Sequence, residues 1–233
     1  MNRKYIILFF LLIVQLNNLT AQKTYFGFDA GYGTYEMTEI KHVLENSMNT
    51  NVLQPHCVSD FPGYLFFRPY LGIEYRYLNL GFAYTLMSTG SRYSIHDYSG
   101  EYKFDAQIVG NAAGAFAEIP VYSFRRFKFL IAAEGGIILN KMKLNETFQL
   151  NDIDQQYNQQ NEYNLASNNF FIKPYIKAEY KVWKSISSTI SVGYHKDIDE
   201  KNMHIEGDDS RKSEFIADWD GLRASIGISF RFE

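Results

Sequence analysis

An unbroken alternation of apolar and polar side chains near the C-terminus constrains the fold of this chain more than any other feature. Side chains of a strand point alternately to its two faces, so a strict period of two predicts a β-strand with one apolar face. About 9–11 residues is the length that a tilted strand needs to cross a bilayer. Between positions 222 and 232 the apolar face carries Leu222, Ala224, Ile226, Ile228, Phe230 and Phe232, and the other face carries Arg223, Ser225, Gly227, Ser229 and Arg231.

The same pattern recurs in seven earlier segments, which brings the predicted number of strands to eight. The clearest copies are 65–77 and 172–182, where one face is apolar and the other carries most of the charged residues. Within the segment 101–122, the small residues from Gly110 to Ala115 predict a bulge or bend. The seven segments are 26–32, 65–77, 80–86, 101–122, 129–139, 172–182 and 186–194.

Connections between these segments alternate strictly between short and long. An up-and-down barrel of an outer membrane has short periplasmic turns and longer outer loops, and eight strands leave an interior that side chains just fill. We therefore expect an all-β fold, an eight-stranded antiparallel up-and-down transmembrane β-barrel with short periplasmic turns and long outer loops. A soluble periplasmic β-sandwich or lipocalin-like carrier is the alternative. The short connections lie near 77–79, 123–126 and 182–185, and the long ones are 38–62, 93–100, 141–168 and 199–218.

Aromatic residues are unusually frequent and have a specific location. They make up 17% of the chain, as 18 Tyr, 19 Phe and 2 Trp, although the apolar fraction of 46% is ordinary. Aromatic side chains at strand ends on the apolar face predict girdles at the two membrane–water interfaces. The residues in these positions are Tyr75, Tyr77, Phe82, Tyr84, Phe127, Phe129, Tyr180, Trp183, Tyr194, Phe230 and Phe232.

The N-terminus has the pattern of a secretory signal peptide. Arg3 and Lys4 precede an apolar run from Tyr5 to Val14, which is too short to span a membrane as a helix. We expect residues 1–21 to be removed and 22–233 to form the barrel domain. No later window is apolar for 18 residues, one Cys excludes an internal disulfide, and a net charge of -3 gives no reason to expect nucleic-acid binding.

Charged residues on the polar faces would lie together inside the barrel. Isolated buried charges are expensive, so these residues must pair or form hydrogen bonds. We expect a polar plug that fills the lumen without a continuous pore, the alternative being a path for small solutes or protons. The predicted lumen cluster is Asp29, Arg68, Glu74, Arg76, Glu118, Glu134, Lys173, Lys177, Glu179, Lys181, Arg223 and Arg231.

A catalytic interpretation depends on a histidine at the predicted outer rim. His195 leaves the seventh strand there, and Ser91 or Ser94 could approach it from a neighbouring loop, as in barrels that modify lipid acyl chains. Neither Ser has a nucleophile motif around it, so we predict a non-enzymatic protein, with a rim-active lipid-modifying enzyme as the alternative. No cofactor and no metal site are predicted, because acidic runs such as Asp208-Asp209 lack the ligand spacing of a calcium loop.

Two of the long connections have features of their own. In the segment 38–48, Ile40, Val43, Leu44 and Met48 share one helical face, which predicts a short helix over the outer mouth. The segment 145–169 is dominated by Asn and Gln and is expected to be a mobile loop.

Several short motifs resemble a known family. They are Thr20-Ala21-Gln22, the segment 116–121 (FAEIPV), the Gly135-Gly136 pair, and the runs 88–92 and 97–102. Together they resemble the small outer-membrane β-barrels abundant in Bacteroidetes, including PorT-like barrels, which are similar to the OmpX and OmpA membrane domains. The resemblance implies an outer-membrane location and a role in envelope structure or surface interaction, and some members serve gliding or type IX secretion. The expected partners are outer-membrane lipid, other envelope or secretion proteins, and the barrel-assembly machinery, the last through Ile226, Ile228, Phe230 and Phe232.

Overall fold

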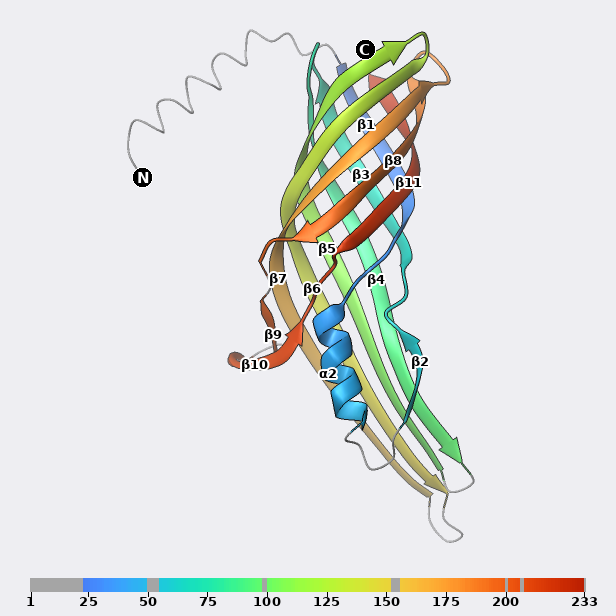
Figure 1. The fold of residues 1–233 in the computed structure, drawn as a ribbon, viewed down its shortest axis with the longest axis vertical. Helices are drawn as coiled ribbons and strands as arrows, with labels where there is room; N and C mark the ends of the chain where they lie inside the picture. Colours follow the sequence, from blue (N-terminus) through green and yellow to red (C-terminus); the bar gives the residue numbers. More distant parts are fainter. Residues whose placement is uncertain are drawn as a thin grey trace, which may run out of the picture.

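A computed structural model describes residues 23–49, 55–97, 100–151, 156–199, 201–205 and 208–232. The predicted signal peptide lies outside these residues. The described chain is almost entirely β-structure with one helix (Figure 1). The strands are β1 (Lys23–Gly33), β2 (His56–Asp60), β3 (Tyr64–Glu74), β4 (Asn79–Asp97), β5 (Gly100–Phe124), β6 (Phe127–Asn151), β7 (Gln156–Lys181), β8 (Ile186–Asp197), β9 (Asn202–Ile205), β10 (Asp208–Ile216) and β11 (Gly221–Phe232), and the helix is α2 (Thr38–Asn49).

Eight strands form a closed antiparallel ring in the order β1-β3-β4-β5-β6-β7-β8-β11. Pairing of β1 with β11, from Thr24↔Phe232 to Gly33↔Arg223, closes the ring. The antiparallel up-and-down topology is therefore confirmed. The prediction of eight strands is correct for the ring alone, because β2, β9 and β10 are additional short strands outside it.

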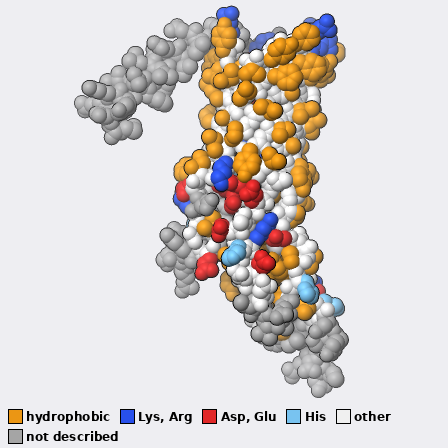
Figure 2. Space-filling model, in the orientation of Figure 1, with side chains coloured by type: hydrophobic (Ala, Val, Ile, Leu, Met, Phe, Trp, Pro, Cys, Tyr) orange, Lys and Arg blue, Asp and Glu red, His pale blue; other side chains and the backbone are white. Residues whose placement is uncertain are grey.

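Side chains of the ring strands alternate between a polar interior and an apolar exterior. In β11, for example, Ile226 is 62% exposed whereas Arg223 is 5% exposed. This confirms the period-two prediction, and it produces the apolar belt around the upper part of the molecule in Figure 2. Every ring strand contributes large exposed apolar side chains, among them Phe28, Leu71, Phe82, Ile119, Ile131, Ile176, Ile190 and Ile226.

The two ends of the ring differ. At one end, here called the short-turn end, brief connections join β3 to β4, β5 to β6 and β7 to β8. At the other end β4, β5, β6 and β7 continue well beyond the ring as a curved sheet (Figure 1). We call this second end the outer part.

Much of the outer part was expected to consist of long loops, and that prediction is wrong for three of the four segments. The segment 199–218 consists mostly of the paired strands β9 and β10. Strands β6 and β7 pair residue by residue from Phe127↔Tyr180 to Asn151↔Gln156, so most of 141–168 is strand and the Asn/Gln-rich segment is not a loop. The segment 93–100 likewise belongs largely to β4 and β5. Leu144 and Leu165 are buried on the concave face of this sheet, which explains why a polar sequence is held in extended form.

The bulge expected between Gly110 and Ala115 is also absent, since β5 pairs with β4 and β6 in continuous register there. Small residues serve packing at this place. A Cβ atom on Gly110 would lie 2.7 Å from a ring carbon of Trp219. The register shift in β5 instead falls between Pro120 and Tyr122, where proline has no N–H to donate to the ladder.

Helix α2 covers the outer mouth of the ring, as predicted for the segment 38–48. Ile40, Leu44 and Met48 on one helical face are buried in a hydrophobic cluster that includes Met142 and Trp219. The helix therefore lies over the concave face of the outer sheet (Figure 1). Among the described residues no helix is long and apolar enough to cross a membrane.

Close approach of β5 and β6 gives a test of the fold at two adjacent glycines. A Cβ atom on Gly136 would lie 2.0 Å from the carbonyl oxygen of Ala113, whereas on Gly135 its nearest neighbour would be 3.5 Å away. We expect Gly136→Ala to lower the free energy of unfolding by about 1–3 kcal/mol through overpacking, and Gly135→Ala to leave it nearly unchanged. Urea unfolding in detergent micelles measures both variants, and equal effects would contradict this register.

Candidate functional site

Most of the predicted lumen cluster does lie together inside the ring. Arg76 and Lys181 are the exceptions. Both are exposed at the short-turn end, where Arg76 places its guanidinium carbon 4.9 Å from the ring centre of Tyr77. Arg76 lies beyond the last paired residue of β3, where the alternation of strand faces no longer applies. Lys181 is paired with the buried Ser187 and keeps the inward side of β7, but it lies where the lumen opens to solvent. The residues inside are Asp29, Arg68, Glu74, Glu118, Glu134, Lys173, Lys177, Glu179, Arg223 and Arg231.

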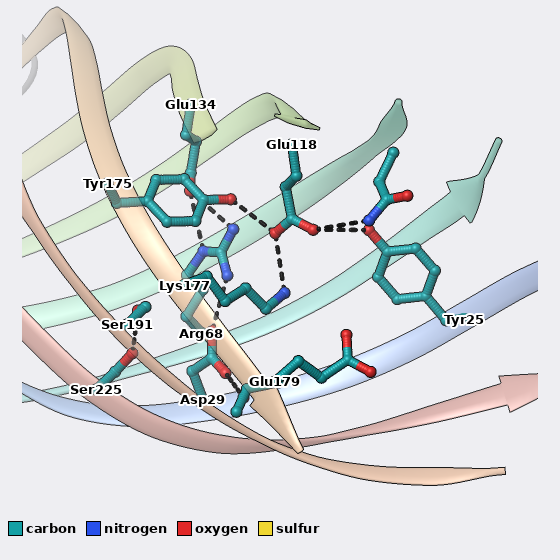
Figure 3. A network of polar contacts seen from close by, with 12 residues as sticks. Tyr25, Asp29, Arg68, Glu118, Glu134, Tyr175, Lys177, Glu179, Ser191 and Ser225 are labelled. Atoms are coloured by element: carbon teal, nitrogen blue, oxygen red, sulfur yellow. Dashed lines mark hydrogen bonds and ion pairs between the residues drawn. The ribbon is translucent and has the colours of Figure 1, made fainter. Parts of the chain in front are cut away.

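Arg68 of β3 is the centre of the network. Its guanidinium donates from Nη1 to Asp29 Oδ2 at 2.8 Å and from Nε to Glu134 Oε2 at 3.0 Å. Lys173 contacts the same Glu134 oxygen at 2.7 Å, and Thr189 donates to Asp29 Oδ1 at 3.1 Å. One Arg thereby joins carboxylates from opposite parts of the ring (Figure 3).

Glu118 of β5 forms a second centre, one layer closer to the short-turn end. Lys177 donates to its Oε1 at 2.9 Å, and the hydroxyl of Tyr175 donates to the same atom at 3.0 Å. Its other oxygen accepts from Asn79 at 3.2 Å and from Tyr25 at 3.4 Å. Four donors around one carboxylate compensate for its complete burial (Figure 3).

A third group closes the short-turn end of the lumen. Arg231 donates from Nε to Glu74 Oε2 at 2.9 Å and from Nη2 to Glu179 at 2.6 Å. Lys128 of β6 also pairs with Glu74. The group therefore links β3, β6, β7 and β11 across the ring.

These layers leave little empty space. At the outer end of the ring, helix α2 and the segments 34–37 and 217–220 form what we call the cap. The cavity between the network and the cap has a volume of about 10 Å³, which is room for about one water molecule. Within these layers five carboxylates are bonded to five cations, so the layers form a hydrogen-bonded plug in which the charges balance.

His195 marks where the plug meets the outer cap, and its environment differs from the solvated rim position that we expected. The side chain is 3% exposed and stacks on Phe171 with ring centres 4.8 Å apart. Its Nε2 lies 3.2 Å from Asp197 Oδ1, and Asp197 Oδ2 accepts from the backbone N–H of Trp219 at 3.1 Å. The ring is buried because the segment that leads into β11 closes over the end of β8, where Trp219 and Asp220 bond to Asp197.

The predicted approach of Ser91 or Ser94 to His195 is wrong. These serines belong to β4, which three strands separate from β8 in either direction around the ring. Ser91 donates its hydroxyl to the carbonyl of Ser59 at 2.8 Å. The structure thus brings neither serine to the histidine.

Arg223 lies in the lumen but does not pair with a carboxylate of the plug. Its guanidinium donates to the carbonyl oxygens of Trp219, at 2.6 Å, and of Thr34. Its carbon lies 4.5 Å from the ring centre of Tyr35. Arg223 therefore connects β11 to the cap by donating hydrogen bonds to backbone carbonyl groups of the cap.

The cap also contains an acidic group that the sequence did not indicate. Glu36, Asp218 and Asp220 place carboxylate oxygens within 4.8 Å of one another, and Lys196 pairs with Asp220. Asp220 is nearly fully buried and accepts from the backbone N–H of Asp197 at 2.7 Å. These carboxylates come from two segments far apart in the sequence, Glu36 before α2 and the pair Asp218 and Asp220 before β11, so no local spacing connects Glu36 to the other two.

Tyr25, Asn79, Lys128 and Tyr175 are network members that the sequence analysis missed. Three of them are uncharged, and the prediction selected only charges. Tyr175 lies between Lys173 and Lys177 and shares their face of the strand, so the alternation that placed the two lysines in the lumen would also have identified Tyr175.

Comparison with known proteins gives the following. No family model and no curated protein matches the chain. Neisserial surface protein A has a TM-score of 0.42 at 13% identity, covering 90% of this chain and 97% of its own. The outer-membrane protease OmpT of Escherichia coli scores 0.39 at 8% identity (91% and 98% covered), and the N-terminal β-barrel of Pseudomonas aeruginosa OprF scores 0.38 at 11% (91% and 100%). At these values the likeness does not extend to function.

Removal of the Arg68 guanidinium should lower the free energy of unfolding substantially. Arg68→Met leaves Asp29 without its buried cationic partner, and we expect the free energy of unfolding to fall by about 3–5 kcal/mol. Adding Asp29→Asn should recover part of that loss. Arg92→Ala, which removes an exposed pair with Asp105, is the matched control and should cost less than about 1 kcal/mol. Equal losses in urea unfolding of Arg68→Met and Arg92→Ala would refute the central role of Arg68.

Asp218, in the cap and outside the ring strands, should make stability depend on pH. Burial raises its pKa to about 6, helped by the charges of Asp220 and Asp197 and opposed by a hydrogen bond from the backbone N–H of Asp220. Because this pKa exceeds the ordinary value of about 4, the free energy of unfolding falls as pH rises from about 4 to 6 and stays lower above.

Asp218→Asn removes the charge and keeps an acceptor oxygen. We expect it to raise the free energy of unfolding at pH 7.5 by roughly 1 kcal/mol after solvent screening, with the difference vanishing near pH 4. Trp219 is buried, so its fluorescence during urea unfolding measures the free energy of unfolding at each pH. The measurement uses a Trp183→Phe background, which removes the signal of the other tryptophan, whose side chain is 70% exposed. A difference that does not change with pH would contradict the assignment.

Proposed function

We propose that this chain is a non-enzymatic integral outer-membrane β-barrel protein that acts in envelope structure or surface interaction through its outer part. The arrangement of side chains in the ring carries the proposal. Apolar residues point outward from all eight strands and charged residues point inward, which is the reverse of a water-soluble protein. The motifs that resemble the small barrels of Bacteroidetes also support it.

The apolar belt is too large for a monomer in water. Soluble monomers rarely expose continuous apolar patches beyond a few hundred Å², whereas here every strand of the closed ring carries exposed apolar residues, and Figure 2 shows one face of this belt. Closure of the ring also leaves no sheet edge within the belt, which is the condition for a β-structure to span lipid. Lipid is therefore the partner that fits this surface.

Exposed aromatic residues support the same placement. Phe127, Trp183 and Phe232 lie at the short-turn end and are 47%, 70% and 59% exposed. Tyr194 and Tyr64 lie where the ring meets the outer part. Aromatic side chains at two levels suit the two interfaces of a bilayer.

The C-terminal strand supports recognition by barrel-assembly machinery. Ile226, Ile228, Phe230 and Phe232 of β11 all point outward and are at least 41% exposed. Before the ring closes, this strand has a free edge and one continuous apolar face, which an assembly factor can bind.

Two alternatives have less support. A carrier needs an enclosed space for its ligand, and the cavity between the charged network and the outer end of the ring holds only about 10 Å³. A rim-active enzyme needs an accessible His near a nucleophile, and His195 is buried against Phe171 and Asp197. A role through the outer part, which has its own hydrophobic core, remains the function best supported.

A charge on the lipid face tests the membrane placement directly. Ile226 lies near the middle of β11 and is 62% exposed. In a bilayer, Ile226→Lys should lower the free energy of unfolding by about 2–4 kcal/mol, because lysine at mid-bilayer depth is costly. In water the same change at an exposed site would cost no more than about 0.5 kcal/mol.

Val58→Lys is the matched control, since Val58 is 64% exposed but lies in β2, outside the ring. Unfolding in lipid vesicles should separate the two variants. Equal, small effects, or recovery of the native protein without detergent in the soluble fraction, would overturn the proposal.

A further inference from the structure

The short-turn end of the ring contains a hollow with a strongly basic lining. Its volume is about 240 Å³, and it opens where the lumen meets solvent. Six cationic residues line it, together with only two carboxylates, Glu74 and Glu179. The cations are Lys23, Arg125, Arg126, Lys128, Lys181 and Arg231.

Both carboxylates are already engaged by two of these cations. Arg231 contacts Glu74 at 2.9 Å and Glu179 at 2.6 Å, and Lys128 pairs with Glu74. The lining therefore has an excess of positive charge that its own carboxylates do not balance. Arg125, Arg126 and Lys181 contribute to this excess, and they come from the β5–β6 turn and the end of β7.

The turn that supplies two of the cations has an unusual backbone. Arg125 has a φ of 53°, in the left-handed region where Gly or Asn is usual in tight hairpins. Its guanidinium carbon lies 5.1 Å from the ring centre of Phe124, which fixes the side chain at the rim. An arginine in a strained turn position, held by an aromatic ring, is expected where the guanidinium itself has a role.

Charge is distributed unequally along the whole molecule. Figure 2 shows Lys and Arg side chains at the short-turn end and Asp and Glu side chains gathered below the apolar belt. The outer part contributes, among others, Glu36, Asp218 and Asp220. An anion is therefore attracted to the short-turn end.

We propose that this hollow binds a phosphate group. Arg125 and Arg126 are consecutive residues that both line the hollow, and guanidinium groups present several donors to the oxygens of a tetrahedral anion. Lys181 and Ser123 belong to the same lining. The phosphate can belong to an anionic phospholipid headgroup at the membrane surface or to a free phosphate compound. The lipid source rests on the membrane placement proposed above, whereas binding of free phosphate does not.

Calorimetric titration of the full chain in maltoside micelles with inorganic phosphate tests the shared chemistry. We expect saturable binding that weakens with added salt, and at least a tenfold loss of affinity in Arg125→Gly/Arg126→Gln. Glycine suits the left-handed position, so this variant should keep its fold. Lys184→Gln is the matched control, because Lys184 lies in a short turn but not in the hollow, and its affinity should stay within twofold of the parent.

A second titration in nanodiscs separates the two sources. If an anionic headgroup occupies the hollow, phosphate affinity should fall at least fivefold when phosphatidylglycerol is added to phosphatidylcholine. If a free compound is the ligand, the two affinities should agree. Either result supports the site, whereas no saturable binding by the parent, or unchanged affinity in Arg125→Gly/Arg126→Gln, would overturn it. Failure of the Ile226→Lys test would leave the micelle titration valid.

Discussion

Hydrogen bonding between β1 and β11 is the constraint on which the rest of this structure depends. By pairing the first strand of the sheet with the last, it leaves the ring without an edge and divides its side chains into an interior and an exterior. The interior of an eight-stranded ring is narrow, so charged groups that enter it meet one another instead of water. The plug around Arg68 and Glu118 and the outward apolar belt are both consequences of that closure.

The ring was predictable because side chains alternate along a strand, so position in the sequence determines which face a side chain occupies. This local rule assigned Asp29, Arg68 and Glu134 to the interior correctly. It could not say that Arg68 bridges the other two, because that contact depends on the register between β1 and β3 and on a distance across the lumen. The alternation ceases to apply beyond the last pair of a strand, which is why Arg76 was misplaced, and it does not say where the lumen opens to solvent, which is why Lys181 is exposed.

The outer part was harder to predict because its composition is typical of loops. Asn and Gln in β7 satisfy their backbone groups through the ladder with β6, and only scattered apolar residues such as Leu144 and Leu165 indicate burial. The cap depends on contacts between segments far apart in the chain. Trp219 donates its indole N–H to Asn140 at 2.8 Å and occupies space that Gly110 leaves open, and neither relation has a local signature. For the same reason the burial of His195 was not predicted, and Arg223 was correctly placed in the lumen without its backbone acceptors.

Continuity of β5 and β6 from the lumen to the tip of the outer part has a mechanical consequence. Each strand has 25 residues, an extended length of about 80 Å, compared with about 30 Å for the hydrocarbon layer of a bilayer. A pull on the tip along the strands loads many ladder hydrogen bonds in shear at once, instead of opening them one after another. The outer part is therefore a stiff projection that transmits tension into the ring, where the ion pairs of the plug resist deformation of its cross-section.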